Sequence, residues 1–170
     1  MLLVAMPKTA STSFAHTLAE VLNVRKNQVL LRPSKLPAAD GFPWLSKYHS
    51  DCRRWPEDDV RHMIDAPNVY KQHLPPASVC SSDYVLLVRE PVEIIGAYGR
   101  TSKVVTDPGG LADELTRFMW GHLANGPRLV LSYDMIITNP RRALAHVIDA
   151  WGLDVPIKPD VELAKLRYTR

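Results

Sequence analysis

Residues 2–13 read LLVAMPKTASTS, and this stretch decides the fold that we expect. Its first part, residues 2–6, is a short apolar run, which is typical of a strand buried on both faces of a sheet. The residues that follow the turn place Phe14, Leu18 and Val21 on one face of a helix, with Ser11 or Thr12 as the N-cap. A buried strand, a hydroxyl-rich turn and an amphipathic helix predict the first unit of an α/β protein.

The same alternation continues along the chain. Further strands are expected at residues 28–31, 68–72, 84–88 and 129–131. Further helices are expected at residues 56–66, 91–98, 111–124, 140–151 and 159–166. Residues 33–56 are expected to form an irregular excursion. Strands that alternate with helices predict a central parallel sheet flanked by helices on both faces. In such sheets ligands bind outside the carboxyl ends of the strands. The loops at 7–13, 72–76, 89–91 and 132–134 are therefore the places where a site is expected.

Composition limits the class of protein. With 170 residues, 46% hydrophobic and 23% charged, the chain is expected to form one domain over 1–170 with its own core. The longest apolar runs fall far short of a membrane span, and the opening residues do not resemble a secretory signal, so a cytoplasmic protein is expected. A net charge of +3, from scattered basic residues, favours small anionic partners over nucleic acid. Two cysteines and six dispersed histidines predict no metal.

The turn after the first strand has the chemistry of an anion cradle. Hydroxyl groups and backbone N–H groups gather at the start of a helix, where the helix dipole favours negative charge, and Lys8 adds a full positive charge. The turn differs from the ATP- and GTP-binding P-loop pattern, because the lysine comes first and glycine is absent. A capped turn without a ligand is the structural alternative, and the strand before the turn favours phosphate or sulfate.

Four segments, in this order, resemble the PAPS-dependent sulfotransferase family. PKTASTS at 7–13 resembles its 5′-phosphosulfate loop, and YKQHLP at 70–75 is similar to its Lys-Thr-His-Leu-Pro strand end. YVLLVREPVE at 84–93 resembles the strand and turn that open its 3′-phosphate site, and LSYDMIITNPRR at 131–142 resembles its Tyr-Glu-Asp-Leu segment. Together the segments span nearly the whole chain.

The resemblance implies a three-layer P-loop NTPase-like fold that binds 3′-phosphoadenosine 5′-phosphosulfate (PAPS). The implied reaction moves a sulfuryl group to a hydroxyl or amine of a small-molecule or glycan acceptor, without a metal. Lys8 would contact the phosphosulfate and neutralise charge on the leaving oxygen, the logic that also governs phosphoryl transfer. The rest of the implied phosphosulfate site is the loop: Ala10, together with Thr9, Ser11, Thr12 and Ser13, which would donate hydrogen bonds to the same groups.

The second and third segments supply the other implied site residues. His73 is the candidate base, because an acceptor hydroxyl needs a group that takes its proton near neutral pH. Lys71 shares a strand face with His73 and is expected near the same sulfate. Arg89 is expected at the 3′-phosphate, since a guanidinium offers a fork of donors to phosphate oxygens. A structural histidine and a surface lysine are the alternatives for His73 and Lys71.

Two departures from the family pattern concern the 3′ end of the nucleotide. The serine expected eight residues after Arg89 is Ala97, and Thr101 or Ser102 could replace it only if the chain shifts. The family's basic C-terminal loop is missing, and Arg167 and Arg170 could stand in for it. These departures keep open a non-catalytic domain that binds an anion or nucleotide. A P-loop kinase is a further alternative, for which Asp134 would be the magnesium carboxylate.

Aromatic side chains are the remaining feature of the sequence that bears on a binding site or a core. Phe42, Trp44, Tyr48 and Trp55 lie in the irregular excursion, and either an acceptor groove or a minor core explains them. His49 lies in the same excursion, where an acceptor contact is an alternative that no motif supports. Tyr84, Trp120 and Trp151 are expected in the core or at its edge.

Overall fold

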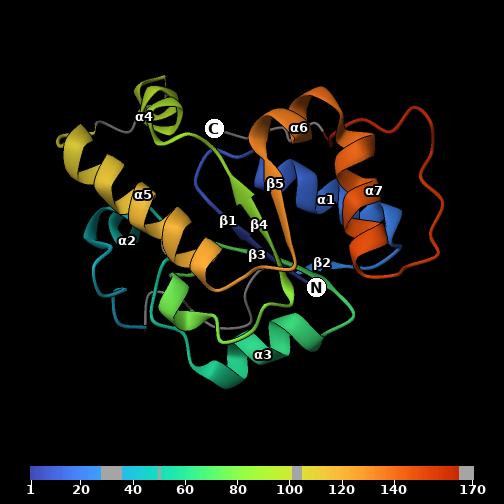
Figure 1. Ribbon diagram of the computed structural model, residues 1–170, viewed down its shortest axis with the longest axis horizontal. Helices are drawn as coiled ribbons and strands as arrows, with labels where there is room; N and C mark the ends of the chain where they lie inside the picture. The colour runs from blue at the N-terminus through green and yellow to red at the C-terminus, as the bar shows by residue number, and fades with distance from the viewer. Residues whose placement is uncertain (28–35, 50, 101–104, 165–170) are drawn as a thin grey trace.

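The computed structural model describes residues 1–27, 36–49, 51–100 and 105–164. Its centre is a five-stranded parallel sheet in the order β2-β3-β1-β4-β5 (Figure 1). The strands are β1 (Leu2–Ala5), β2 (Lys26–Asn27), β3 (Val69–Gln72), β4 (Tyr84–Val88) and β5 (Leu129–Ser132). The predicted α/β class and the parallel sheet flanked by helices are confirmed.

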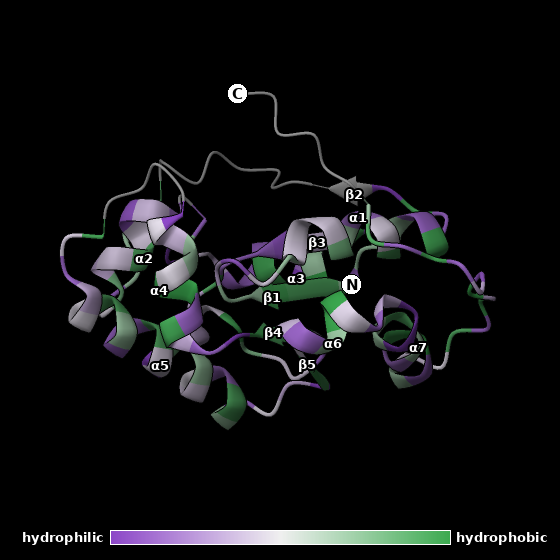
Figure 2. Ribbon diagram, turned by 90° about the horizontal axis from the view of Figure 1, so that it is seen from above, coloured by the Kyte–Doolittle hydropathy of each residue, from purple (hydrophilic) through white to green (hydrophobic). Residues whose placement is uncertain are grey.

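Helices cover both faces of the sheet. One face carries α1 (Ser11–Val21), α6 (Tyr133–Thr138) and α7 (Pro140–Ala150), and the other carries α2 (Pro43–Tyr48), α3 (Glu57–Asp65), α4 (Pro91–Gly99) and α5 (Pro108–Ala124). A short 3₁₀ turn, η2 (Pro76–Ser78), follows β3. Figure 2 shows the central strands in the green of hydrophobic residues between the helices.

Alternation along the strands divides the core into two halves. In β1, Leu2 and Val4 face α3 and α5, whereas Leu3 and Ala5 face α1 and α7. All four side chains are fully buried, because helices cover both faces of a parallel sheet. The register pairs Val4 with Gln72 of β3 and with Leu86 of β4, so β1 is the middle strand and its carboxyl end is enclosed by the ends of its two neighbours.

Several sequence predictions were wrong in detail. The excursion over 33–56 contains α2, and the expected loop at 132–134 is the start of α6, where the Ser132 hydroxyl caps the helix by accepting from Met135 N–H. Residues 159–164 form a turn and irregular chain where a helix was expected. Trp120 is 62% exposed on α5, although a position in the core or at its edge was predicted. The strand predicted at 28–31 lies outside the described residues.

Two of the four ambiguous aromatics belong to the core. Phe42 and Trp55 are buried with the α3–α5 half of the core, whereas Trp44 and Tyr48 of α2 are half-buried and stack on one another. Within the part of the chain that the structure describes, no helix has the length and apolar character to cross a membrane.

Candidate functional site

The loop between β1 and α1 has an unusual backbone. Lys8 and Ala10 both take left-handed conformations, with φ of 58° and 54°. Left-handed residues set between ordinary ones turn successive backbone N–H groups toward one concave side, which forms an anion-binding nest. Ala10 is the N-cap of α1 and offers its first turn no side-chain acceptor. The loop therefore presents backbone donors at the positive end of a helix.

The loop hydroxyls divide into two groups. Thr9 is fully buried and donates its hydroxyl proton to the Met6 carbonyl at 2.8 Å, so this hydroxyl holds the loop in shape. Ser11 is also buried, whereas Thr12 and Ser13 are half-buried at the open side of the turn. The predicted role of the Thr9 hydroxyl as a donor to a ligand would require it to leave Met6.

A pocket of about 260 Å³ opens where the loop meets the end of β3. Its lining unites most of the predicted site: Lys8, Thr9, Ala10, Ser11, Thr12, Ser13, Lys71 and His73, together with His49. Two lysines and two histidines line this space, and none of the described lining residues is acidic. The pocket is therefore suited to a small anion, with an imidazole at its edge.

His73 is held in one orientation at the end of β3. It is 6% exposed, and its backbone N–H donates to Asp51 Oδ2 at 2.9 Å. Its Nδ1 lies 2.6 Å from the Ala5 carbonyl oxygen, which can only accept, so Nδ1 carries the proton. Nε2 lies 2.7 Å from Lys71 Nζ and accepts from that ammonium group. The prediction that Lys71 and His73 share a face is confirmed, and Nε2 is the atom that can take a proton.

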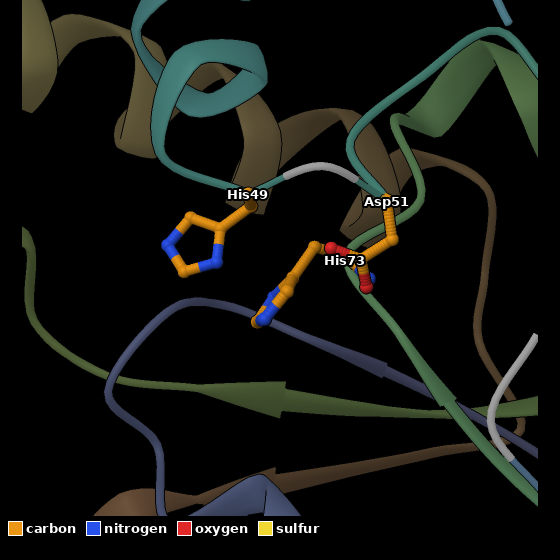
Figure 3. A group of neighbouring side chains, drawn as sticks. All are labelled: His49, Asp51 and His73. Atoms are coloured by element: carbon orange, nitrogen blue, oxygen red, sulfur yellow. The ribbon is translucent and has the colours of Figure 1, made fainter. Parts of the chain in front are cut away.

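A second histidine lies beside the first. His49, the C-cap of α2, has its ring centroid 4.2 Å from that of His73, and Figure 3 shows the two rings approaching from different elements. Its Nε2 is hydrogen-bonded to the hydroxyl of Tyr98, a fully buried residue of α4. Lys8 Nζ lies 5.2 Å from the centroid of the Tyr98 ring. Tyr98 thus connects the loop lysine with His49.

His49, Asp51 and His73 have the residue types of a metal site, and their ligand atoms lie within 4.8 Å of one another. The hydrogen bonds favour another interpretation. Both ring nitrogens of His73 already have partners, and one partner is the ammonium of Lys71, which opposes a second cation at the same nitrogen. We interpret the three residues as a polar cluster at the pocket edge, in which Asp51 binds the backbone of His73 and the two imidazole rings are in contact.

Arg89 contacts the loop from the end of β4. Its Nη1 donates to the Lys8 carbonyl at 2.8 Å, its Nε donates to Glu93 at 3.0 Å, and its guanidinium carbon lies 3.7 Å from the centroid of the Tyr133 ring. The Arg89 side chain is 11% exposed and does not line the pocket. The structure thus gives Arg89 a role in holding the backbone of Lys8, while its role at a 3′-phosphate stays a prediction.

The remaining predicted residues of the 3′ end are not brought together with Arg89. Ala97 lies in the last turn of α4 and offers no hydroxyl. Arg167 and Arg170, and the substitutes Thr101 and Ser102, lie outside the described residues. The residues that were predicted to bind a phosphosulfate therefore lie together in the structure, whereas of the side-chain donors predicted for the 3′ end only Arg89 is among the described residues.

Sequence reasoning missed Asp51, Tyr98 and the buried carboxylate Glu114. It weighed His49 without assigning it a role. None of the four belongs to a recognisable motif, and each reaches its place through packing between distant segments. Asp51, for example, binds the backbone of a residue 22 positions later.

Comparison with known proteins identified no related protein or family. The chain matches no protein-family model, and no curated protein is significantly similar to it. The residues and the geometry of the pocket are therefore the basis for assigning a function.

Proposed function

We propose that this protein is a small sulfotransferase with a P-loop-like fold, which takes a sulfuryl group from PAPS and transfers it to a hydroxyl or amine of a small-molecule or glycan acceptor. The observation that carries the proposal is the pocket. There the loop at 7–13, which has two residues in left-handed conformations, meets Lys71 and His73. An anion nest, two lysines and a positioned imidazole are the groups that sulfuryl transfer requires.

Each residue of the pocket would have a role that follows from its position. Lys8 and the backbone donors of the loop would bind the phosphosulfate and stabilise the charge that develops on the leaving oxygen. His73 Nε2 would accept the acceptor's proton, since Nδ1 is committed to the Ala5 carbonyl. Lys71 would leave Nε2 and move toward the sulfate when the acceptor hydroxyl takes its place. PAPS supplies the activated sulfuryl group and needs no metal ligand from this chain.

The kinase alternative has less support. Asp134, the carboxylate that it needs, is exposed in the first turn of α6, and it does not line the pocket. The non-catalytic alternative shares the anion site and differs only in turnover, so experiment has to separate it from the enzyme.

The test combines nucleotide binding with transfer. Calorimetry with 3′-phosphoadenosine 5′-phosphate (PAP) should show saturable binding, and labelled PAPS should pass its sulfuryl group to members of an acceptor panel without added magnesium. Lys8→Ala should lower transfer at least about 100-fold, the effect typical of removing one transition-state donor. Lys158→Ala, which removes an exposed lysine outside the pocket, is the matched control.

Each outcome has a distinct meaning. No PAP binding at high micromolar concentration would reject the sulfotransferase. PAP binding without transfer to any acceptor would favour the non-catalytic domain. Unchanged transfer in Lys8→Ala would reject the role of that lysine.

A further inference from the structure

The acceptor side of the pocket carries two histidines whose hydrogen bonds are complementary. The Nδ1 of His73 faces the Ala5 carbonyl, which leaves Nε2 as the hydrogen-bond acceptor on the pocket side. The Nε2 of His49 faces the Tyr98 hydroxyl, and its Nδ1 lies on the side of the ring that faces His73 (Figure 3).

In one of the two neutral tautomers of His49, the Tyr98 hydroxyl is the donor of this hydrogen bond. Tyr98 is fully buried, and burial raises the pKa of its phenol well above the usual value, so the hydroxyl keeps its proton. When that hydroxyl donates to Nε2, the neutral imidazole carries its own proton on Nδ1. His49 then offers a donor beside the acceptor atom of His73, with the two ring centroids 4.2 Å apart.

We propose that His49 and Tyr98 select the acceptor, and that the preferred acceptor is a vicinal diol. The hydroxyl to be sulfated would donate to His73 Nε2, and the oxygen on the neighbouring carbon would accept from His49 Nδ1–H. This inference rests on the proposed sulfotransferase function and specifies its acceptor class.

The aromatic side chains of α2 help to hold the Tyr98–His49 pair in place. Trp44 and Tyr48 stack with ring centroids 6.1 Å apart, and Tyr48 lies 5.8 Å from Tyr98 by the same measure. Both rings are half-buried and lie outside the pocket lining, and Tyr48 contacts Tyr98, the hydrogen-bond partner of His49.

The experiment compares matched acceptors in sulfuryl transfer from labelled PAPS. The pairs are catechol with phenol, and cis-1,2-cyclohexanediol with cyclohexanol. In the wild-type protein we expect kcat/KM at least about 10-fold higher for the diol of at least one pair, because a site built to hydrogen-bond an oxygen discriminates against the analogue that lacks it. PAP affinity is measured by calorimetry on the same samples.

Two variants connect the preference with the histidine. His49→Phe keeps a ring and removes the donor, so it should reduce the diol preference to about twofold or less while PAP affinity stays within about twofold. Tyr98→Phe removes only the hydroxyl that orients His49, and it should weaken the preference in the same direction. His146→Phe on α7, outside the pocket, should keep the wild-type preference.

The outcomes separate this inference from the proposed function. Equal rates for diol and single alcohol, or a diol preference that survives in His49→Phe, would overturn the acceptor assignment and leave the sulfotransferase intact. PAP binding with no transfer to any of the four compounds would also overturn it. Absence of PAP binding would reject the underlying function.

Discussion

At the scale of single residues, His73 is the group on which the proposed chemistry depends. Its two ring nitrogens have different tasks, because Nδ1 holds the ring to Ala5 and Nε2 faces Lys71 and the pocket. Arg89, at the end of β4, also acts through a single contact: it donates to the carbonyl of Lys8 and so supports the left-handed backbone at that residue.

His73→Asn tests the base. The asparagine amide can still donate to the Ala5 carbonyl but lacks the proton acceptor at the position of Nε2. We expect kcat to fall about 100-fold or more, as is typical of losing a general base, while PAP affinity changes less than about threefold. Steady-state kinetics and calorimetry measure the two effects. Turnover at the wild-type rate would exclude His73 as the base.

Gln72, the neighbour of His73, faces the opposite side of the sheet, and its side chain lowers the stability of the folded protein. It is fully buried, and among the described residues neither its amide nitrogen nor its amide oxygen has a hydrogen-bond partner. An unsatisfied buried amide costs about 1–3 kcal/mol. Gln72→Met, which has a similar shape, should therefore raise the free energy of unfolding by about 1–2 kcal/mol in urea titrations. A loss of stability would mean that the amide is satisfied in solution.

At the scale of elements, α2 depends on a carboxylate from another helix. Phe42, the N-cap residue of α2, provides no side-chain acceptor, and the backbone N–H groups of Trp44 and Leu45 donate to the two oxygens of Glu114 at 2.9 Å each. Glu114 is 2% exposed on α5. Because α2 ends at His49, this contact also positions the acceptor side of the pocket.

Removing this contact should destabilise the protein and release α2. Glu114→Ala should lower the free energy of unfolding by about 2–4 kcal/mol, because it removes two hydrogen bonds to a charged group. Glu114→Gln keeps one acceptor and should cost less. Urea titration measures stability, and hydrogen exchange at the Trp44 and Leu45 amides should accelerate. Asp113→Ala, an exposed neighbour on α5, is the control; equal effects of Asp113→Ala and Glu114→Ala would contradict the assignment.

At the scale of the whole molecule, His122 joins α5 to β4 and to the loop that follows β3. Its Nε2 donates to the Leu74 carbonyl at 2.8 Å, and its Nδ1 lies 3.1 Å from the Tyr84 hydroxyl, so the neutral imidazole has both nitrogens satisfied. Burial lowers the pKa of His122 from 6.5 to about 4. Leu74 directly follows His73, which makes this core contact a support for the end of β3.

Stability should consequently fall in mild acid. Below about pH 6.5 the unfolded chain binds a proton at His122, whereas the folded chain binds this proton only near pH 4. The free energy of unfolding therefore falls by up to about 3 kcal/mol between these pH values. Urea titrations at pH 7 and pH 4.5 measure the loss. His122→Gln, which does not titrate, should show a smaller loss between the two pH values; an equal loss in both proteins would exclude His122 as the source.

The sequence by itself determined what depends on local pattern. Continuous apolar runs placed β1 and β4, because a strand buried on both faces needs continuous hydrophobicity, and the shorter, more polar β3 and the partly exposed β5 were also predicted. The loop at 7–13 followed from its hydroxyls, Lys8 and its place between strand and helix. The shared face of Lys71 and His73 followed from the twofold repeat of a strand. Each of these features is set by residues within a few positions of one another.

Tertiary structure alone decided the acceptor side of the site. His49 and Tyr98 are 49 positions apart, and Glu114 contacts backbone groups 69 and 70 positions away. A lone histidine, tyrosine or glutamate carries no periodic signal. α2 was missed for the same reason, since this six-residue helix is too short to be stable by its own propensity and takes its N-terminal acceptors from α5. Packing of α2, α4 and α5 on one face of the sheet brings these groups to the end of β3.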